Sequence, residues 1–205
     1  GDWAANHFPL DPDGNVYRAS KSPWNANLDY RGTNAATYQG QTGLGYYKTS
    51  HRDENDWTDL FRLTYALSTN TADADYVTAV QTNANIEEWL LYFMVFNFFD
   101  SQETSLGNGV GDDYAMYRGL VDPRFILIGH DYDTILGQGD TPQSTTRSIW
   151  NAVDAPRATG SADRANFVPR FMRHPEFAPI CFRLWKQQLD TTFSPEQVNP
   201  LLDEV

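Results

Sequence analysis

Cysteine is almost absent from this sequence, which holds one, Cys181, among 205 residues. A single cysteine excludes an internal disulfide and a zinc site built from cysteines, so we expect Cys181 to lie in the core. Basic residues are also scarce, since 15 Lys and Arg face 27 Asp and Glu and give a formal net charge of −12. This charge argues against binding to nucleic acid or to an anionic membrane, and it attracts cations.

Long hydrophobic runs are missing as well. The longest, Trp89–Phe99, contains Asn97 and is about half as long as a membrane-spanning helix. We therefore expect no membrane insertion. Several catalytic signatures are also missing: no serine lies in a GxSxG turn, no two histidines form HExxH, and no GK[ST] follows the glycines near residue 43.

Aromatic residues, in contrast, are frequent, with 6 Trp, 11 Tyr and 12 Phe in a sequence that is 40% apolar. This composition is typical of a globular protein, and the length fits a single domain over residues 1–205 with a proper core. The frequent Asn, Thr, Gly and Tyr with few Lys indicate an extracellular or cell-surface protein.

The periodicity of apolar residues predicts an α+β fold, mostly helical with a few short antiparallel strands. Strands are expected at residues 15–19, 28–30, 46–49, 113–118 and 125–128, the last two forming a hairpin around a turn at Asp122-Pro123. Helices are expected at residues 53–67, 74–81, 85–97, 167–173, 177–189 and 194–202.

The helix at 85–97 has the clearest pattern. Asn85 and Glu88 form a capping-box-like pair at its start. Beyond the first turn the helix is apolar almost all round, which predicts a position in the middle of the core. The helix leads directly into Asp100.

The stretch FILIGHDYDTILG, Phe125–Gly137, combines an apolar run with acidic residues. Its first four residues predict a strand buried on both faces, which breaks at Gly129. His130, Asp131 and Asp133 follow. A buried strand that ends in closely spaced carboxylates commonly holds a metal ion, and a strand followed by an Asp-capped turn is the alternative.

Pairing of the two hairpin strands brings further carboxylates to the same place. Asp113 begins one strand and Asp131 ends its antiparallel neighbour, so both fall at one edge of the sheet. A cluster of carboxylates with Asp100, Asp112 and Asp133 costs stability unless a cation neutralises it or some members protonate. Oxygen ligands favour Mg²⁺, Mn²⁺ or Ca²⁺ and a metal-dependent phosphoryl transferase or hydrolase. Solvated turn aspartates are the alternative.

Several motifs, in one order along nearly the whole chain, resemble the CotH family of atypical, secreted or spore-coat protein kinases. They are GNVYRA at 14–19, LDYRG at 28–32, YYKTS at 46–50, NDWTDLFRL at 55–63, NFFD at 97–100, DYAMY at 113–117 and FILIGHDYDTILG at 125–137. The family reads approximately NYxLY and PWDxDxTFG at the last two, so Asp113 replaces Asn and Gly129-His130 replaces Pro-Trp.

The resemblance implies the C-terminal lobe of an atypical protein-kinase-like fold, with ATP and Mg²⁺ or Mn²⁺ as cofactors. It makes Asp100 the catalytic aspartate that orients or deprotonates the acceptor hydroxyl. It makes Asp131 a metal ligand, joined by Asp113 and Asp133, although Asp133 also fits a residue that only caps the following turn. The N-terminal lobe is expected upstream of Gly1, so this stretch alone should bind ATP poorly and be inactive.

Three hypotheses follow for the function. The first is transfer of the γ-phosphate of ATP to Ser or Thr of a surface or coat protein. The second is a non-catalytic structural or adhesion module of an extracellular assembly, whose partner is a neighbouring surface protein. The third is a binding domain that Ca²⁺ stabilises through the same acidic cluster.

Overall fold

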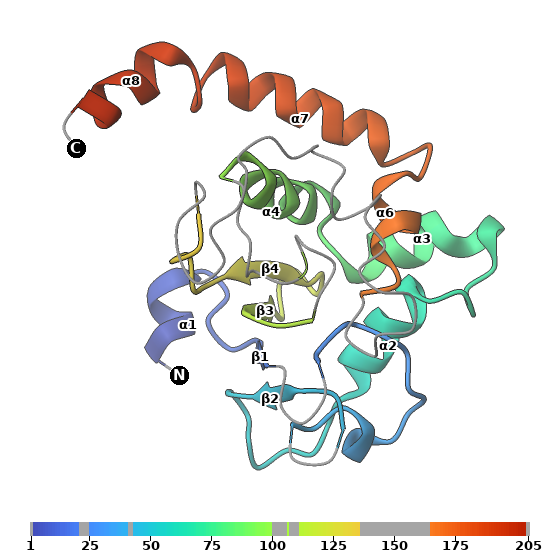
Figure 1. Cartoon of the computed structure of the whole chain (residues 1–205). Helices are drawn as coiled ribbons and strands as arrows, with labels where there is room; N and C mark the ends of the chain where they lie inside the picture. Colours follow the sequence, from blue (N-terminus) through green and yellow to red (C-terminus); the bar gives the residue numbers. More distant parts are fainter. Residues whose placement is uncertain are drawn as a thin grey trace.

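The protein folds around a small sheet in the computed structural model, which describes residues 2–20, 25–40, 43–99, 106, 111–135 and 165–203. The strands form an antiparallel sheet in the order β2-β1-β3-β4 (Figure 1). They are β1 (Asn15–Ala19), β2 (Tyr46–Lys48), β3 (Tyr114–Arg118) and β4 (Ile126–Gly129). The helices are α1 (Asp2–His7), the short 3₁₀ helix η1 (Ala35–Thr37), α2 (Thr58–Leu67), α3 (Asp73–Asn83), α4 (Ile86–Phe98), α6 (Val168–Met172), α7 (Ala178–Asp190) and α8 (Pro195–Asp203). The expected α+β class is confirmed.

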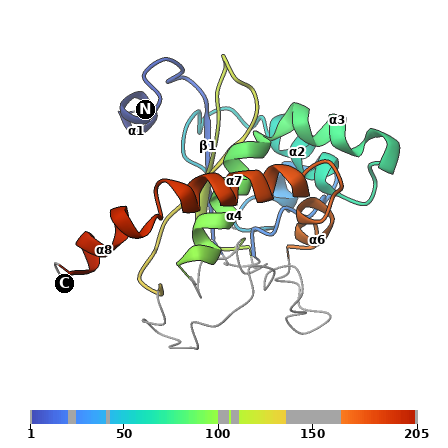
Figure 2. The same ribbon diagram turned by 90° about the horizontal axis from the view of Figure 1, so that it is seen from above.

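Helix α4 is the middle layer of the molecule, with the sheet on one side and α7 on the other (Figures 1 and 2). Trp89, Leu90 and Phe93 are fully buried, and only Glu87 and Glu88 in its first turn are exposed. Its predicted central position is therefore confirmed. None of the helices in the described ranges is long and apolar enough to span a membrane.

One face of the sheet is buried, and α4 packs against the sheet at β4. Tyr17, Met116 and Leu127 are register partners across β1, β3 and β4, and all three are buried on this face. Ile126 and Ile128 point to the opposite face and are only half-buried. The prediction that this strand is buried on both faces is wrong, because only the face that carries Leu127 is fully covered.

The predicted strand at 28–30 is also wrong. Leu28 has a φ of 59°, which is left-handed and incompatible with extended strand backbone. The buried hydroxyl of Tyr46 accepts a hydrogen bond from the Leu28 N–H at 2.9 Å. This segment is therefore shaped by a side chain of β2 rather than by ladder pairing.

The N-terminus of α2 is fastened to the sheet by Asp59. Its carboxylate accepts hydrogen bonds from the Tyr17 hydroxyl at 2.6 Å and from the Asn15 amide at 2.7 Å. Asp56 accepts from the Thr58 N–H at 2.9 Å, where the helix begins. These contacts join helix and strand through charge-assisted hydrogen bonds.

Cys181 lies on α7 and is buried, as expected. Burial raises the pKa of its thiol to about 11. Helix α8, which follows α7, has no buried residue and leads away from the body of the molecule (Figure 2). The thiol is therefore a packing group within the helical layer.

Candidate metal site at the end of the hairpin

The hairpin of β3 and β4 brings together residues that are 17 positions apart in sequence. Tyr114 pairs with Gly129, and the Asp113 carbonyl accepts from the His130 N–H at 3.5 Å, which extends the ladder by one residue. A carboxylate oxygen of Asp113, one of Asp131 and a ring nitrogen of His130 all lie within 4.8 Å of one another. Asp113 and Asp131 thus meet at one edge of the sheet, where the antiparallel pairing predicts them.

Two of these three residues have unusual backbone conformations. Asp113 has a φ of 49° and Asp131 a φ of 60°, both in the left-handed region. Asp tolerates this region better than most residues, yet each case costs about 1 kcal/mol or more. Such strain is retained where the surrounding structure requires a particular side-chain direction, and here it occurs on both sides of one cluster.

The site runs from buried to exposed. Asp112 is buried, Asp113 and His130 are half-buried, and Asp131 is exposed. Asp133 is exposed as well and does not belong to the group of three found among the described residues. Asp131 is therefore the member that solvent reaches most easily.

His130 supplies a direct test of whether a metal ion fits. Its Nε2 atom is buried, and within the described part of the chain it has no hydrogen-bond partner. Buried polar atoms are almost always satisfied, so this orphaned Nε2, on a ring that lies beside two carboxylates, calls for a partner. Two oxygens and one imidazole nitrogen suit a divalent cation, with Mn²⁺ better matched to the nitrogen than Mg²⁺ or Ca²⁺.

An aromatic wall borders the site on the α4 side. Phe96 stacks on Tyr132 at a ring distance of 5.1 Å, and Tyr92 lies 4.3 Å from Phe96. Both Phe96 and the Tyr132 hydroxyl lie over Gly129, where a Cβ would come within 2.4 Å and 2.2 Å of them. Only glycine therefore allows the Tyr132 side chain to fold back over the end of β4.

Tyr92 in this wall has a second orphaned atom. Its hydroxyl is buried without a hydrogen-bond partner among the described residues. Burial raises the pKa of Tyr92 well above its ordinary value, and nearby Tyr132 and Asp113 raise it further. From the sequence, a tyrosine in an apolar helix is predicted to be a core residue. No pattern in the sequence predicts that its hydroxyl lies near Asp113.

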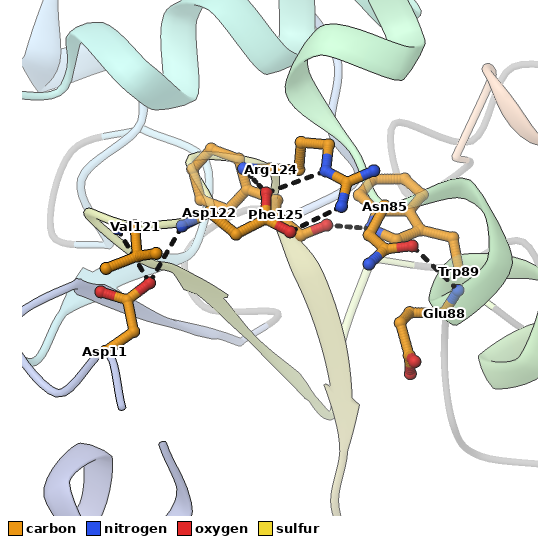
Figure 3. Close-up of polar contacts among 8 residues, drawn as sticks. All are labelled: Asp11, Asn85, Glu88, Trp89, Val121, Asp122, Arg124 and Phe125. Carbon is orange, nitrogen blue, oxygen red and sulfur yellow. Dashed lines mark hydrogen bonds and ion pairs between the residues drawn. The ribbon is translucent and has the colours of Figure 1, made fainter. Parts of the chain in front are cut away.

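Helix α4 and strand β4 run in the same direction. At their beginnings, the Phe125 carbonyl accepts from the Asn85 N–H at 2.9 Å and from the Trp89 indole at 2.8 Å (Figure 3). At their ends, Phe96 contacts the position of Gly129. The last turn of α4 therefore lies beside the site. Asp100, predicted as the catalytic residue, lies outside the described residues.

The far end of the hairpin is held by Asp11. Its carboxylate accepts from the backbone N–H groups of Leu120, Val121 and Asp122 at 2.8, 3.0 and 3.1 Å. Figure 3 shows the bonds from Val121 and Asp122. A Cβ at Gly119 would lie 1.8 Å from that carboxylate, so glycine is needed for the close approach. Partial burial raises the pKa of Asp11, but the three donors outweigh it and hold that pKa below its ordinary value.

A buried pair of tyrosines fixes the start of β3. The hydroxyls of Tyr46 and Tyr114 lie 3.0 Å apart, and Tyr114 donates to the Ala26 carbonyl. The Ala26 N–H in turn donates to the Gly111 carbonyl at 2.7 Å. These contacts hold the backbone just before Asp113. They were not predicted, because nothing in the sequence links residues 26, 46 and 114.

Comparison with protein families gives one match over this chain. The family described as CotH kinase protein matches residues 3–205. A search of curated proteins found no match. The family match covers both strands of the hairpin and α4, which together form the site described above, and it supports a kinase-like domain. The chain therefore belongs to the CotH kinase family.

Proposed function

We propose that this chain is the metal-binding lobe of a protein kinase that transfers the γ-phosphate of ATP to Ser or Thr of a protein. Family membership supports the kinase-like domain. The observation that carries the metal dependence is the approach of ligand atoms from Asp113, His130 and Asp131 to within 4.8 Å. A carboxylate pair beside an imidazole, whose Nε2 is buried and has no hydrogen-bond partner among the described residues, matches a divalent-cation site.

Each residue of this site has a distinct role in the proposal. Asp131 is exposed and would hold the ion on the side that faces a nucleotide, while Asp113 and His130 would hold it from the sheet. A divalent ion held there would supply positive charge that neutralises the transferred phosphate. Asp133, exposed and outside the group, would only shape the turn. Asp100 would orient the acceptor hydroxyl and accept its proton.

The acceptor in this proposal is a surface or coat protein, and the location is extracellular or at the cell surface. The composition supports this location through its many Asn, Thr, Gly and Tyr residues and its few lysines. The resemblance of the motifs to secreted and spore-coat kinases supports the kind of acceptor.

The experiment measures the transfer of labelled γ-phosphate from ATP by the full-length protein with Mg²⁺ or Mn²⁺. Loss of a residue that supports a metal ligand typically lowers activity about 10–100-fold. Asp131→Asn changes a proposed ligand itself, so its rate of phosphate transfer is expected to fall by at least this factor. Asp133→Asn makes the same charge change two residues away and should retain wild-type transfer. Equal transfer by wild type and Asp131→Asn would refute the role of Asp131.

A second candidate is a non-catalytic module that a bound cation stabilises. The specific observation in its favour is His130, because an imidazole is an unusual ligand for the Mg²⁺ of a phosphoryl transferase. Titration with Mn²⁺ separates the two functions. Binding that raises the melting temperature, depends on Asp131 and occurs without phosphate transfer or ATP binding would favour the module.

A further inference from the structure

A cavity of about 460 Å³ lies on another part of the molecule. Its walls come from residues 28–31, from the turn between α2 and α3, and from the start of α6. Its polar side chains include Asp29, Arg31, Asn70, Asn166 and Arg170, and none of them belongs to the candidate metal site. The volume falls within the range of small-molecule sites, about 300–1,000 Å³.

Hydrogen bonds between distant parts of the chain fix the shape of this cavity. The Asn166 amide donates to the Asp29 carboxylate at 3.2 Å and joins α6 to the loop. The Arg170 guanidinium donates to the carbonyls of Ser68 at 2.7 Å and Thr71 at 3.0 Å and joins α6 to the α2–α3 turn. The walls are thus held in place before any ligand arrives, which lowers the cost of binding.

The lining of the cavity includes the left-handed residue Leu28. Its side chain is buried while the next residue, Asp29, lines the cavity. The Asn27 carboxamide accepts from the Asp29 N–H at 3.1 Å and so holds this turn of the backbone. A left-handed backbone is strained for Leu, and such strain is concentrated at ligand sites. The strain here positions Asp29.

The charges around the cavity are paired. Arg31 lies 3.3 Å from Asp29, and Arg170 lies 2.5 Å from Asp73 just outside the lining. An anionic ligand would meet both carboxylates and a chain of net charge −12. A cationic ligand would have to compete with both arginines. An uncharged ligand avoids both penalties.

Uncharged hydrogen-bonding groups and aromatic surface complete the lining. Asn70 and Asn166 are exposed carboxamides, each able to donate and accept. The Arg31 side chain is 47% exposed and offers further N–H donors. Tyr30 lines the cavity and packs edge-on against Tyr65 at 5.2 Å. Paired donors and acceptors beside an aromatic ring match the hydroxyls and the apolar face of a sugar.

We propose that this cavity binds an uncharged, hydroxyl-rich ligand, namely a neutral sugar residue of a glycan. The inference does not depend on phosphate transfer or on the metal site. A failure of either proposal therefore leaves the other in place.

The test is calorimetric and NMR titration of the full chain with a panel of neutral sugars: glucose, galactose, mannose, N-acetylglucosamine and their β1–4 disaccharides. Glucuronic acid and glucosamine are the charged probes. We expect at least one neutral sugar to bind, and its charged counterpart to bind more weakly. Asn166→Ala and Asn70→Ala should each weaken binding about tenfold, the effect of losing a hydrogen bond to the ligand.

The control is Asn199→Ala, which removes an exposed carboxamide of the same kind from α8. The Asn70 side chain makes no hydrogen bond or ion pair within the described part of the chain, so its variant tests recognition even where Asn166→Ala lowers stability. Absence of binding by every neutral sugar would overturn the proposal. Tighter binding of a charged probe, or wild-type affinity in both the Asn70 and Asn166 variants, would overturn it as well.

Discussion

Replacing Asp11 by alanine tests how the hairpin is held at the end opposite the candidate metal site. The substitution removes the acceptor for three backbone N–H groups, those of Leu120, Val121 and Asp122. It leaves the Asp11 carbonyl in place, so the hydrogen bond from the Tyr117 hydroxyl to that carbonyl is retained. The effect therefore reports on the carboxylate alone.

The magnitude follows from the number of donors and their exposure. A side chain that caps backbone N–H groups at a helix start contributes about 0.5–2 kcal/mol. Three donors place Asp11 at the upper end of this range, while the exposure of Leu120 and Val121 lets water replace part of the loss. We expect a loss of about 2 kcal/mol, which lowers the melting temperature of a chain of this size by about 4–8 °C.

The assay is urea unfolding of wild type, Asp11→Ala and Asp11→Asn at pH 7 and in acid. The pKa of Asp11 is lowered in the folded state, so its contribution is present above its ordinary value of 3.8 and is lost as the pH falls through the folded-state value. Asn keeps an acceptor oxygen without the charge and should lose about half as much. Wild-type stability of both variants at pH 7, or a difference that persists unchanged in acid, would contradict this reasoning.

Two further predictions concern buried groups. Tyr92→Phe removes a hydroxyl that has no hydrogen-bond partner among the described residues, so the metal-free variant should be as stable as wild type or up to about 1 kcal/mol more stable. Tyr114→Phe breaks a hydrogen-bonded pair of hydroxyls and should lower the free energy of unfolding in urea by about 1–3 kcal/mol. Destabilisation by Tyr92→Phe equal to that by Tyr114→Phe would show that the Tyr92 hydroxyl is satisfied. The Cys181 thiol is buried and has a pKa of about 11, so at pH 8 it should react with iodoacetamide only as fast as the protein unfolds. Modification at the rate of an exposed thiol would show that α7 opens locally.

Local patterns were sufficient for the elements that build the site. The apolar run from Ile86 carries its own cap at Asn85, and the structure begins and ends this helix within a residue of the expected bounds. The hairpin was predictable because Asp122-Pro123 marks its turn and two short strands flank it. Once these strands pair, the meeting of Asp113 and Asp131 follows from antiparallel geometry alone.

Long-range contacts account for what the sequence did not predict. The run at 125–128 has the composition of a strand buried on both faces, but burial depends on what packs against each face, and Ile126 and Ile128 are only half-buried. Leu28 lies in a sequence with strand propensity, yet the Tyr46 hydroxyl dictates its backbone. The three backbone partners of Asp11 are about 110 residues away, and no local pattern marks such a pairing.

The close packing over Gly129 also constrains which sequences this hairpin can accept. The Tyr132 side chain occupies the space that any side chain at position 129 would need, so a substitution at one position requires a substitution at the other. A proline at 129, as in the family pattern, requires a smaller or differently directed side chain at 132. We therefore expect glycine at 129 and an aromatic residue at 132 to occur together among relatives. An alignment that scores the two positions independently would underestimate how strongly this part of the hairpin is constrained.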